Sequence, residues 1–154
     1  NLLTRDFGIY TNEWWYTKIE RKILVEELLS TNFQFPPVDY KFFVFDGEVH
    51  YIQVDYDRFS NHTRTFYNKN WIAQPFQLLY PKGPVSSPPK NLDVMIKVAE
   101  KLANGFDFVR IDLYDMVDRV VFGEMTFCPE AGWGKFKPND WDYNFGLLWG
   151  LTKQ

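Results

Sequence analysis

The sequence predicts an α+β fold, a mainly antiparallel sheet built of hairpins with helices packed on one face. The chain contains two candidate β-hairpins, and each precedes a candidate helix with clear end signals. Strands that pair locally, alternating with helices that can cover a face, favour this layer over a doubly wound parallel sheet. With 154 residues, 45% of them hydrophobic, the chain has the length of one domain with a sizeable core.

The first part of the chain is expected to supply most of the strands. Residues 22–29 form a short apolar run led by β-branched residues and are read as a strand, although their length leaves a helix open. Residues 38–45 and 48–55 flank Asp46-Gly47, a strong short signal for a hairpin turn. Two further segments that could extend the sheet are residues 63–67 and 71–79.

The second part is expected to contain both helices and the second hairpin. Asn91 is placed to cap a helix over residues 92–103, whose apolar side chains recur on one face. A hairpin over residues 108–127 follows, and Asn139 is placed to cap a closing helix that contains Phe145. The order of hairpin, helix, hairpin and helix is the basis of the predicted fold.

Composition excludes several classes of function. The net charge of −3 and the lack of a Lys/Arg block argue against nucleic acid as a partner. No apolar run approaches the ~20 residues of a transmembrane helix. One cysteine and two histidines do not make a structural zinc site, and a lone cysteine points weakly to a reducing compartment, so a cytoplasmic protein is expected. Because the first residue is not Met, we expect a fragment of a longer protein.

Two acidic residues of the second hairpin lie in otherwise apolar, strand-forming stretches. Asp112 lies within residues 108–114, and Glu124 lies within residues 120–129. A charged group in such a strand is disfavoured unless something pairs with it, and a divalent cation is the usual partner of two facing acids. The first hypothesis for this hairpin is therefore a metal site.

Whether the two acids share a face depends on the hairpin register, because side chains alternate with period two. A three-residue tip, residues 116–118, would pair Arg110 with Glu124 and place both acids on one face. A two-residue tip would place them on opposite faces, and a bulge would change the count. The alternative to a metal site is an ion pair between Arg110 and Glu124, with Asp112 facing solvent.

The order of these motifs resembles that of the ATP-grasp superfamily. Arg110-Ile-Asp112, a hairpin tip and then Gly123-Glu-Met-Thr-Phe127 resemble the C-terminal core of these enzymes. Together with Asp39-Tyr-Lys-Phe-Phe-Val-Phe-Asp-Gly47, residues 53–64 and the Asn91 helix, they are similar to the TupA-like branch. That branch is linked to the biosynthesis of teichuronopeptide and other surface polysaccharides. The resemblance covers the second half of the ATP-grasp clamp.

The resemblance implies a set of catalytic and metal-binding residues. Asp112 and Glu124 would hold the Mg²⁺ ions that bridge the phosphates of ATP. Thr126 stands where most members have Asn, and a hydroxyl is a weaker cation ligand than an amide oxygen. Lys41 would reach a phosphate as a point charge, and Arg110 would bind an acylphosphate or the acceptor carboxylate.

The resemblance also implies a nucleotide site and an activity. The adenine of ATP would lie against the backbone of Glu26, Glu27 and Leu28, and the ribose would lie near Asp39. The implied enzyme is a carboxylate–amine ligase, whose partners are a nucleotide and a carboxylate, amine or glycan-precursor substrate. Residues 1–154 are expected to form a single partial domain, with the absent first lobe as its packing partner and no activity of the isolated chain. The alternative is a non-catalytic aromatic-rich β-domain that binds a saccharide or a protein partner.

Overall fold

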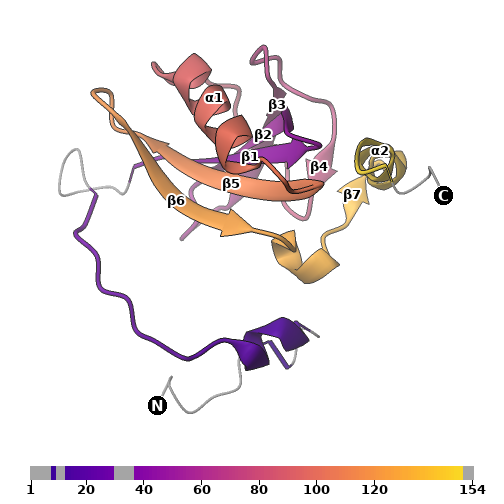
Figure 1. Cartoon of the computed structure of the whole chain (residues 1–154). Helices are drawn as coiled ribbons and strands as arrows, with labels where there is room; N and C mark the ends of the chain where they lie inside the picture. The colour runs from indigo at the N-terminus through magenta and orange to yellow at the C-terminus, as the bar shows by residue number, and fades with distance from the viewer. Residues whose placement is uncertain (1–7, 10–12, 30–36, 151–154) are drawn as a thin grey trace.

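A five-stranded antiparallel sheet forms the centre of the molecule (Figure 1), in a computed structural model that describes residues 8–9, 13–29 and 37–150. The strand order is β3-β2-β1-β5-β6, and β4 pairs with β7 in a separate small sheet. The elements are the 3-10 helix η2 (Trp14–Lys18), strands β1 (Asp39–Phe45), β2 (Glu48–Tyr56), β3 (Thr63–Asn68) and β4 (Gln77–Leu78), helix α1 (Leu92–Leu102), strands β5 (Phe108–Asp115) and β6 (Val120–Thr126), the 3-10 helix η3 (Pro129–Gly132), strand β7 (Phe136–Lys137) and helix α2 (Asp140–Leu148). The predicted α+β class is confirmed.

The first hairpin forms around the predicted turn. Asp46 and Gly47 both have positive φ angles, 47° and 81°, as a two-residue turn that follows the strand twist requires. Its first strand, β1, lies in the middle of the sheet and pairs with β2 on one side and β5 on the other. This central position brings Lys41 of β1 directly opposite Asp112 of β5.

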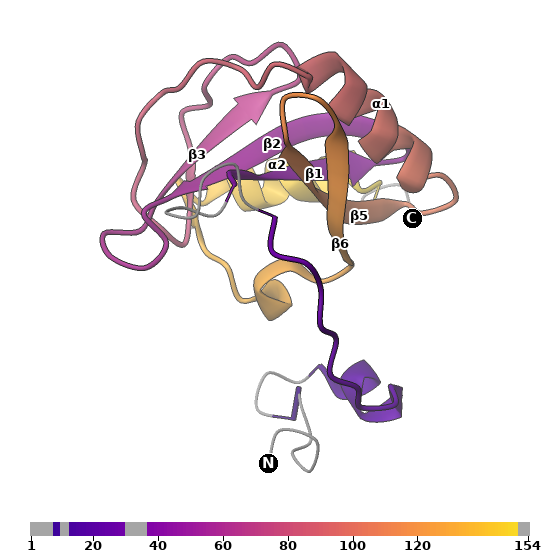
Figure 2. The same cartoon turned by 90° about the vertical axis from the view of Figure 1, so that its left-hand side faces the viewer.

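The sheet is covered on both faces. On one face, α1 buries Met95 and Ala99 against strand residues such as Phe42. On the other, Phe43 packs in an aromatic cluster with Phe145 of α2. The sequence analysis placed the helices on one face, and the difference arises because residues 42–45 are apolar at every position and so need cover on both sides. Figure 2 shows α1 above the sheet and both 3-10 helices below it.

Two predicted strands are wrong or much shorter than predicted. Residues 22–29 have no helix or strand structure and are largely exposed, with Val25 at 92%, because this segment pairs with no strand among the described residues. Of residues 71–79, only Gln77–Leu78 form a strand, in the small sheet. By contrast, both predicted helices and the strand that starts at Thr63 are confirmed.

The second hairpin contains a bulge that sets its register. Asp115 pairs with Val120, so the tip comprises residues 116–119, and the register then shifts between Asp112 and Leu113. Neither tip length considered in the sequence analysis is present. The shift places Gly123 as the extra residue of β6 and brings Glu124 directly opposite Asp112. The Asn91 side chain, positioned before α1, donates to Asp115 at 2.7 Å and makes no cap hydrogen bond.

No helix in the part of the chain that the structure describes is both long and apolar enough to cross a membrane.

Candidate functional site

A row of polar side chains crosses four strands on the face opposite α1. The strand registers place Gln53 beside Lys41, Lys41 beside Asp112, and Asp112 beside Glu124. Because alternate residues of a strand share a face, Asp39 and Arg110 lie on the same side as this row. The row lies next to the aromatic cluster under α2, so one face of the sheet is part core and part polar site.

Asp112 is the centre of the polar site. Its residue is only 2% exposed, and both carboxylate oxygens accept hydrogen bonds. Arg110 binds it through two nitrogens, with Nε 2.7 Å from Oδ1 and Nη2 2.9 Å from Oδ2. Lys41 donates to Oδ2 from the neighbouring strand. Burial of a carboxylate is strongly unfavourable without partners, and two cations pair with this one.

Arg110 links the two acids of the hairpin. Its Nη2 also donates to Oε1 of Glu124 at 2.8 Å and to the Thr126 hydroxyl at 3.0 Å. Burial alone would lower the pKa of Arg110, but the hydrogen bonds and charges of Asp112 and Glu124 outweigh it and raise that pKa. The ion pair that was the alternative to a metal site is therefore present, but Asp112 is buried and does not face solvent.

Asp39 holds the other side of Lys41. One of its oxygens accepts hydrogen bonds from Lys41 and from Arg58, the latter at 3.4 Å. The other oxygen, Oδ1, is buried with no hydrogen-bond partner among the described residues. Burial, with a further contribution from the charge of Asp112, raises the pKa of Asp39 despite the neighbouring Lys41. A buried oxygen without a partner carries the cost of a missing hydrogen bond.

A second buried ion cluster lies beside the first, between β2 and β3. Arg64 donates through Nε to Asp55 at 2.6 Å and through Nη2 to Glu130 at 3.1 Å. Burial would raise the pKa of Asp55, but hydrogen bonds from Arg64 and Gln53 lower it below its ordinary value. Arg64 lies in β3, within the predicted strand over residues 63–67, and also donates to the carbonyl oxygen of Leu78.

A large cavity of about 970 Å³ opens beside the first cluster. Its lining combines the acids Asp39 and Asp112 with exposed apolar side chains, including Phe59 and Phe122. The extended segment through Glu26, Glu27 and Leu28 forms part of its wall, although not as the predicted strand. A cavity lined by both charged and apolar side chains suits a ligand that carries both kinds of group.

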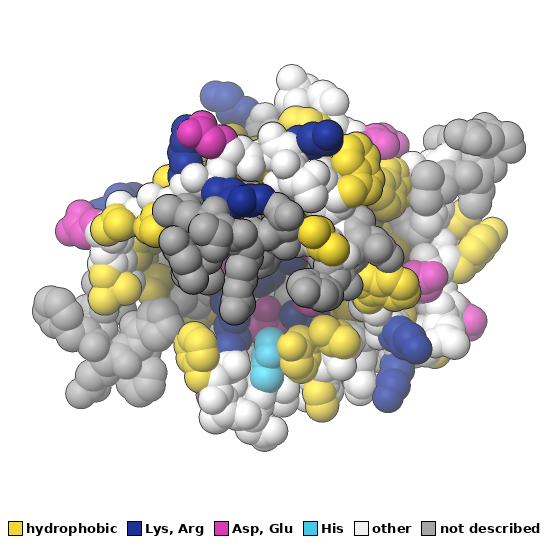
Figure 3. Space-filling view, turned by 90° about the horizontal axis from the view of Figure 1, so that it is seen from below, with side chains coloured by type: hydrophobic (Ala, Val, Ile, Leu, Met, Phe, Trp, Pro, Cys, Tyr) yellow, Lys and Arg dark blue, Asp and Glu magenta, His cyan; other side chains and the backbone are white. Residues whose placement is uncertain are grey.

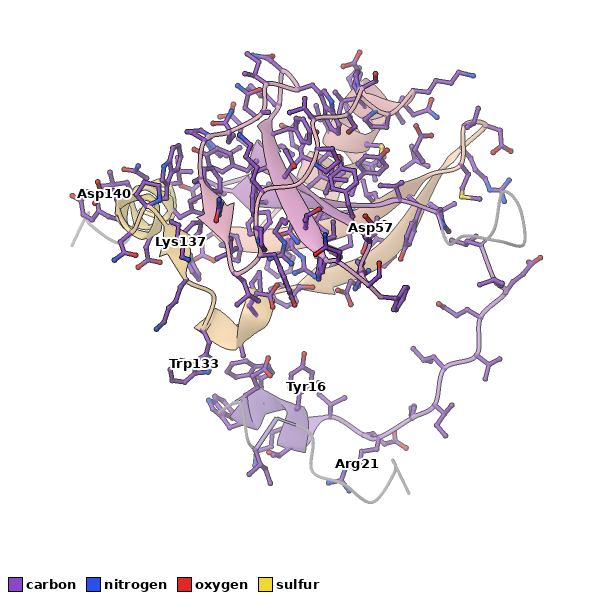
Figure 4. All side chains as sticks on the ribbon, turned by 180° about the vertical axis from the view of Figure 1, so that it is seen from behind. Tyr16, Arg21, Asp57, Trp133, Lys137 and Asp140 are labelled. Atoms are coloured by element: carbon purple, nitrogen blue, oxygen red, sulfur yellow. The ribbon has the colours of Figure 1, made fainter. Side chains whose placement is uncertain are left out.

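A smaller, polar cavity of about 340 Å³ shares the lining residues Lys41, Asp55, Arg58 and Glu124 with the large one. Its lining includes Arg110, Thr126, Glu130 and His62, the last stacked on Tyr80 with ring centroids 3.7 Å apart. In the view from below, a histidine and charged side chains of both signs lie in a recess (Figure 3). Tyr16 of η2 points toward this part of the sheet (Figure 4) and also lines the cavity.

The structure brings six of the predicted site residues into one network. They are Asp39, Lys41, Arg110, Asp112, Glu124 and Thr126. The sequence analysis missed Asp55, Arg58 and Glu130 as site residues. A signal existed for one of them, because Asp55 lies two residues after Gln53 in a predicted strand and so shares its face by alternation.

The oxygen atoms of the network are of the chemical type that a hard divalent cation binds. Carboxylate and hydroxyl oxygens are its preferred ligands, and Glu124 and Asp112 face each other across the hairpin. Within the described residues, no three His, Cys, Asp or Glu side chains are grouped to hold a metal alone. Mg²⁺ usually takes one or two carboxylates and completes its coordination with substrate phosphates and water, so a two-acid site is sufficient when a nucleotide is bound.

The antiparallel sheet thus carries buried basic groups and facing acids beside a cavity that has both charged and apolar lining. The family model described as TupA-like ATPgrasp matches residues 1–149. The chain therefore belongs to the TupA-like ATP-grasp family. Comparison with curated proteins returned no match, and neither did comparison with solved structures.

Proposed function

We propose that the chain is the ATP- and Mg²⁺-binding lobe of a carboxylate–amine ligase that works with a second lobe. The observation that carries this proposal is the row across β1, β5 and β6, in which Lys41, Asp112 and Glu124 lie side by side. Phosphoryl transfer depends mainly on positioning and on neutralising phosphate charge, and both tasks need fixed cations and cation-binding acids. The enzyme would act in the biosynthesis of a surface polysaccharide or teichuronopeptide.

Each residue of the network has a role in this proposal. Lys41 is 5% exposed and pairs with both Asp39 and Asp112, which fix the position of its ammonium group. From this position the ammonium would bind one phosphate of the nucleotide. Arg110 presents a planar guanidinium that suits an acylphosphate or a carboxylate. Asp112, Glu124 and the Thr126 hydroxyl would hold Mg²⁺. Bound Mg²⁺ would bridge phosphate oxygens and neutralise their charge.

The charge of the large cavity favours binding of a nucleotide that carries Mg²⁺ over binding of a nucleotide without it. Seven carboxylates and two basic side chains line it, so it repels an unaccompanied polyphosphate. The carboxylates are Glu26, Glu27, Asp39, Asp55, Asp57, Asp112 and Glu124, and the basic residues are Lys41 and Arg58. A nucleotide that arrives with divalent cations reverses this balance. We therefore expect binding to depend steeply on Mg²⁺.

Apolar side chains of the same cavity support a site for adenine. Leu28 and Phe122 line it, and the backbone of Glu26 and Glu27 runs along it without pairing to a strand. Backbone N–H and C=O groups that no strand uses are free to bind a purine edge. Asp39 also lines the cavity, where its carboxylate can accept a hydrogen bond from a ribose hydroxyl.

Isothermal titration of the chain with ATP, with and without Mg²⁺, tests the proposal. We expect saturable binding with Mg²⁺ and loss of binding when EDTA removes it. Glu48→Gln is the matched control, because Glu48 is an exposed acid paired with Lys69 and lies outside both cavities. Equal binding of ATP with and without Mg²⁺, or no effect of Asp112→Asn, would contradict the proposed site.

One observation favours a second candidate, a domain that binds a saccharide. Trp14 and Trp133 are 66% and 68% exposed, and exposed indoles are common stacking surfaces. The same titration with an oligosaccharide distinguishes the two. Binding of sugar that Trp133→Ala abolishes, with no response to MgATP, would favour the second candidate.

A further inference from the structure

The turn between β2 and β3, residues 57–61, lies beside the large cavity and has no ligand contact in the proposed function. All five of its residues are exposed. Its base is fixed, because Tyr56 pairs with Thr63 at the ends of the two strands. Asp57, the first residue of the turn, has a positive φ of 50°. A short exposed turn on a fixed base can change position as a unit while the sheet stays intact.

Arg58 of this turn lines both cavities and is held only weakly. Its side chain is 50% exposed. Among the described residues its guanidinium makes one hydrogen bond, from Nη1 to Oδ2 of Asp39 at 3.4 Å. A guanidinium has five N–H donors, so most of the donors of Arg58 have no protein acceptor. A half-exposed ion pair of this length contributes little to stability and is easily broken.

Lys41, the other basic residue that lines the large cavity, is held much more firmly. It is buried and pairs with both Asp39 and Asp112. Asp39 therefore keeps a cationic partner when Arg58 leaves it. Arg58 is thus the basic group of the large cavity that can change partners, and a phosphate offers its guanidinium two oxygens at once instead of one.

Phe59, the next residue of the turn, is an apolar side chain placed at the same cavity. It is 92% exposed, so its ring packs against almost no protein atoms, and it lines the large cavity but not the small one. An aromatic ring in this position gains free energy when it covers a ligand and leaves water. Arg58 and Phe59 therefore combine a phosphate donor with an apolar cover on one short turn.

We propose that Arg58 exchanges Asp39 for a phosphate group of the nucleotide, and that this exchange draws residues 57–61 over the large cavity, where Phe59 covers the ligand. This inference rests on the proposed function, because it requires a nucleotide in that cavity. It adds a phosphate-binding residue that lies outside the row across β1, β5 and β6. It also makes closure of the turn depend on the phosphate and not on the base or the ribose.

Isothermal titration of the full chain with MgATP and with adenosine tests the phosphate contact. We expect Arg58→Ala to weaken MgATP binding about tenfold and to leave adenosine binding unchanged, because the contact that is removed is to phosphate. Arg58→Lys should restore part of the affinity, since it keeps the charge without the planar fork. Arg119→Ala is the matched control, because Arg119 is an exposed arginine paired with Asp118 at 2.9 Å and lines neither cavity.

Chymotrypsin cleavage of the bond between Phe59 and Ser60 reports the position of the turn. MgATP should slow this cleavage about tenfold in the unmodified chain and much less in Arg58→Ala, each at a concentration that saturates the protein used. Adenosine should give no protection. Cleavage after Trp133, which is 68% exposed and lines neither cavity, is the internal control and should not respond to MgATP.

Unchanged affinity of Arg58→Ala for MgATP would overturn the inference, as would equal protection of the Phe59–Ser60 bond in both proteins at saturation. An equal loss of affinity in Arg119→Ala would also overturn it, since the effect would then come from net charge. These failures are distinct from failure of the proposed function. A chain that binds no MgATP refutes both proposals, whereas Mg²⁺-dependent binding of ATP that Arg58→Ala leaves unchanged refutes only the role of Arg58.

Discussion

At the scale of single residues, the two facing acids of the hairpin have different environments. Asp112 has a side chain that is 3% exposed and is bound by two cations, whereas the Glu124 side chain is 61% exposed. Removing one partner from a buried ion network leaves uncompensated charge and costs more than removing an exposed partner. Both acids are proposed to bind a cation, but a substitution of Asp112 should also destabilise the protein, whereas a substitution of Glu124 should have little effect on stability.

We expect Asp112→Asn to lower the free energy of unfolding by about 3 kcal/mol or more, because Lys41 and Arg110 lose their shared counter-charge. Glu124→Gln should change it by less than about 1 kcal/mol. Both variants should weaken MgATP binding on the order of tenfold or more. Urea denaturation and isothermal titration measure the two quantities, and equal destabilisation by both variants would refute the difference in environment.

Two aspartates should give opposite pH dependences of stability. The pKa of Asp55 is lowered in the folded state from an ordinary 3.8, so its stabilising contribution is present above that value and is lost as pH falls through the lowered pKa. The pKa of Asp39 is raised from 3.8, so stability falls as pH rises from there through the raised pKa.

Urea denaturation between pH 2 and pH 7 checks this difference. Asp55→Asn should remove part of the loss of stability at the acid end, and Asp39→Asn should remove part of the decline on the neutral side. The second variant also leaves Lys41 with Asp112 as its remaining partner, so the change in slope, not the absolute stability, is the quantity to compare. Identical slopes in the two variants would contradict the assignment.

At the scale of elements, the bulge of β6 determines which face of the second hairpin carries Glu124. Without it, the pairing of Asp115 with Val120 would continue and place Asp112 and Glu124 on opposite faces. The extra residue is Gly123, where an added Cβ would lie 3.1 Å from the carbonyl oxygen of Asp112. The close approach of the two strands thus favours glycine at this position, although its φ is not positive.

Deleting Gly123 is expected to preserve MgATP binding while the protein remains folded. The deletion removes only the residue of β6 that has no partner, so Glu124 then follows Phe122 directly and stays opposite Asp112 in regular pairing. Circular dichroism and isothermal titration give the two readouts. Gly47→Ala is a control for glycine loss, since it strains the first hairpin turn at φ 81° without changing the register of β6. Loss of Mg²⁺-dependent binding in a folded deletion variant would refute this account of the register.

At the scale of the whole molecule, the site depends on a sheet with two cores. The core under α1 is mixed aliphatic and aromatic, and the core under α2 is almost wholly aromatic. Phe145 is the side chain by which α2 joins the second core, and its ring contacts those of Phe43, Phe45, Tyr51, Phe76 and Phe136. Because Phe43 is directly opposite Arg110, this core also supports the polar site.

Phe145→Ala should therefore lower the free energy of unfolding by about 3–5 kcal/mol, the range for a buried phenylalanine. Tyr143→Ala is the matched control on the same helix, because Tyr143 is 63% exposed, and it should change stability by about 0.5 kcal/mol or less. Urea denaturation of both variants measures the difference. A small effect of Phe145→Ala would show that α2 contributes little to the second core.

The sequence alone determined the hairpins, the helices and the unusual acids, since each is a local pattern. Asp46-Gly47 specifies its turn through backbone conformation, and Asp112 is conspicuous because its neighbours are apolar. The sequence did not predict that residues 22–29 lie outside the sheet, because an apolar run of that length fits a strand equally well whether or not an edge is available to pair with it.

Tertiary structure alone decided how the polar groups meet. The bulge at Gly123 set the face of Glu124, and the central position of β1 brought Lys41 to Asp112 from 71 residues away. It also assembled Arg64, Asp55 and Glu130 from separate elements. The physical reason is that register and strand order follow from burying the whole sheet on two faces, a condition that no local stretch of sequence contains.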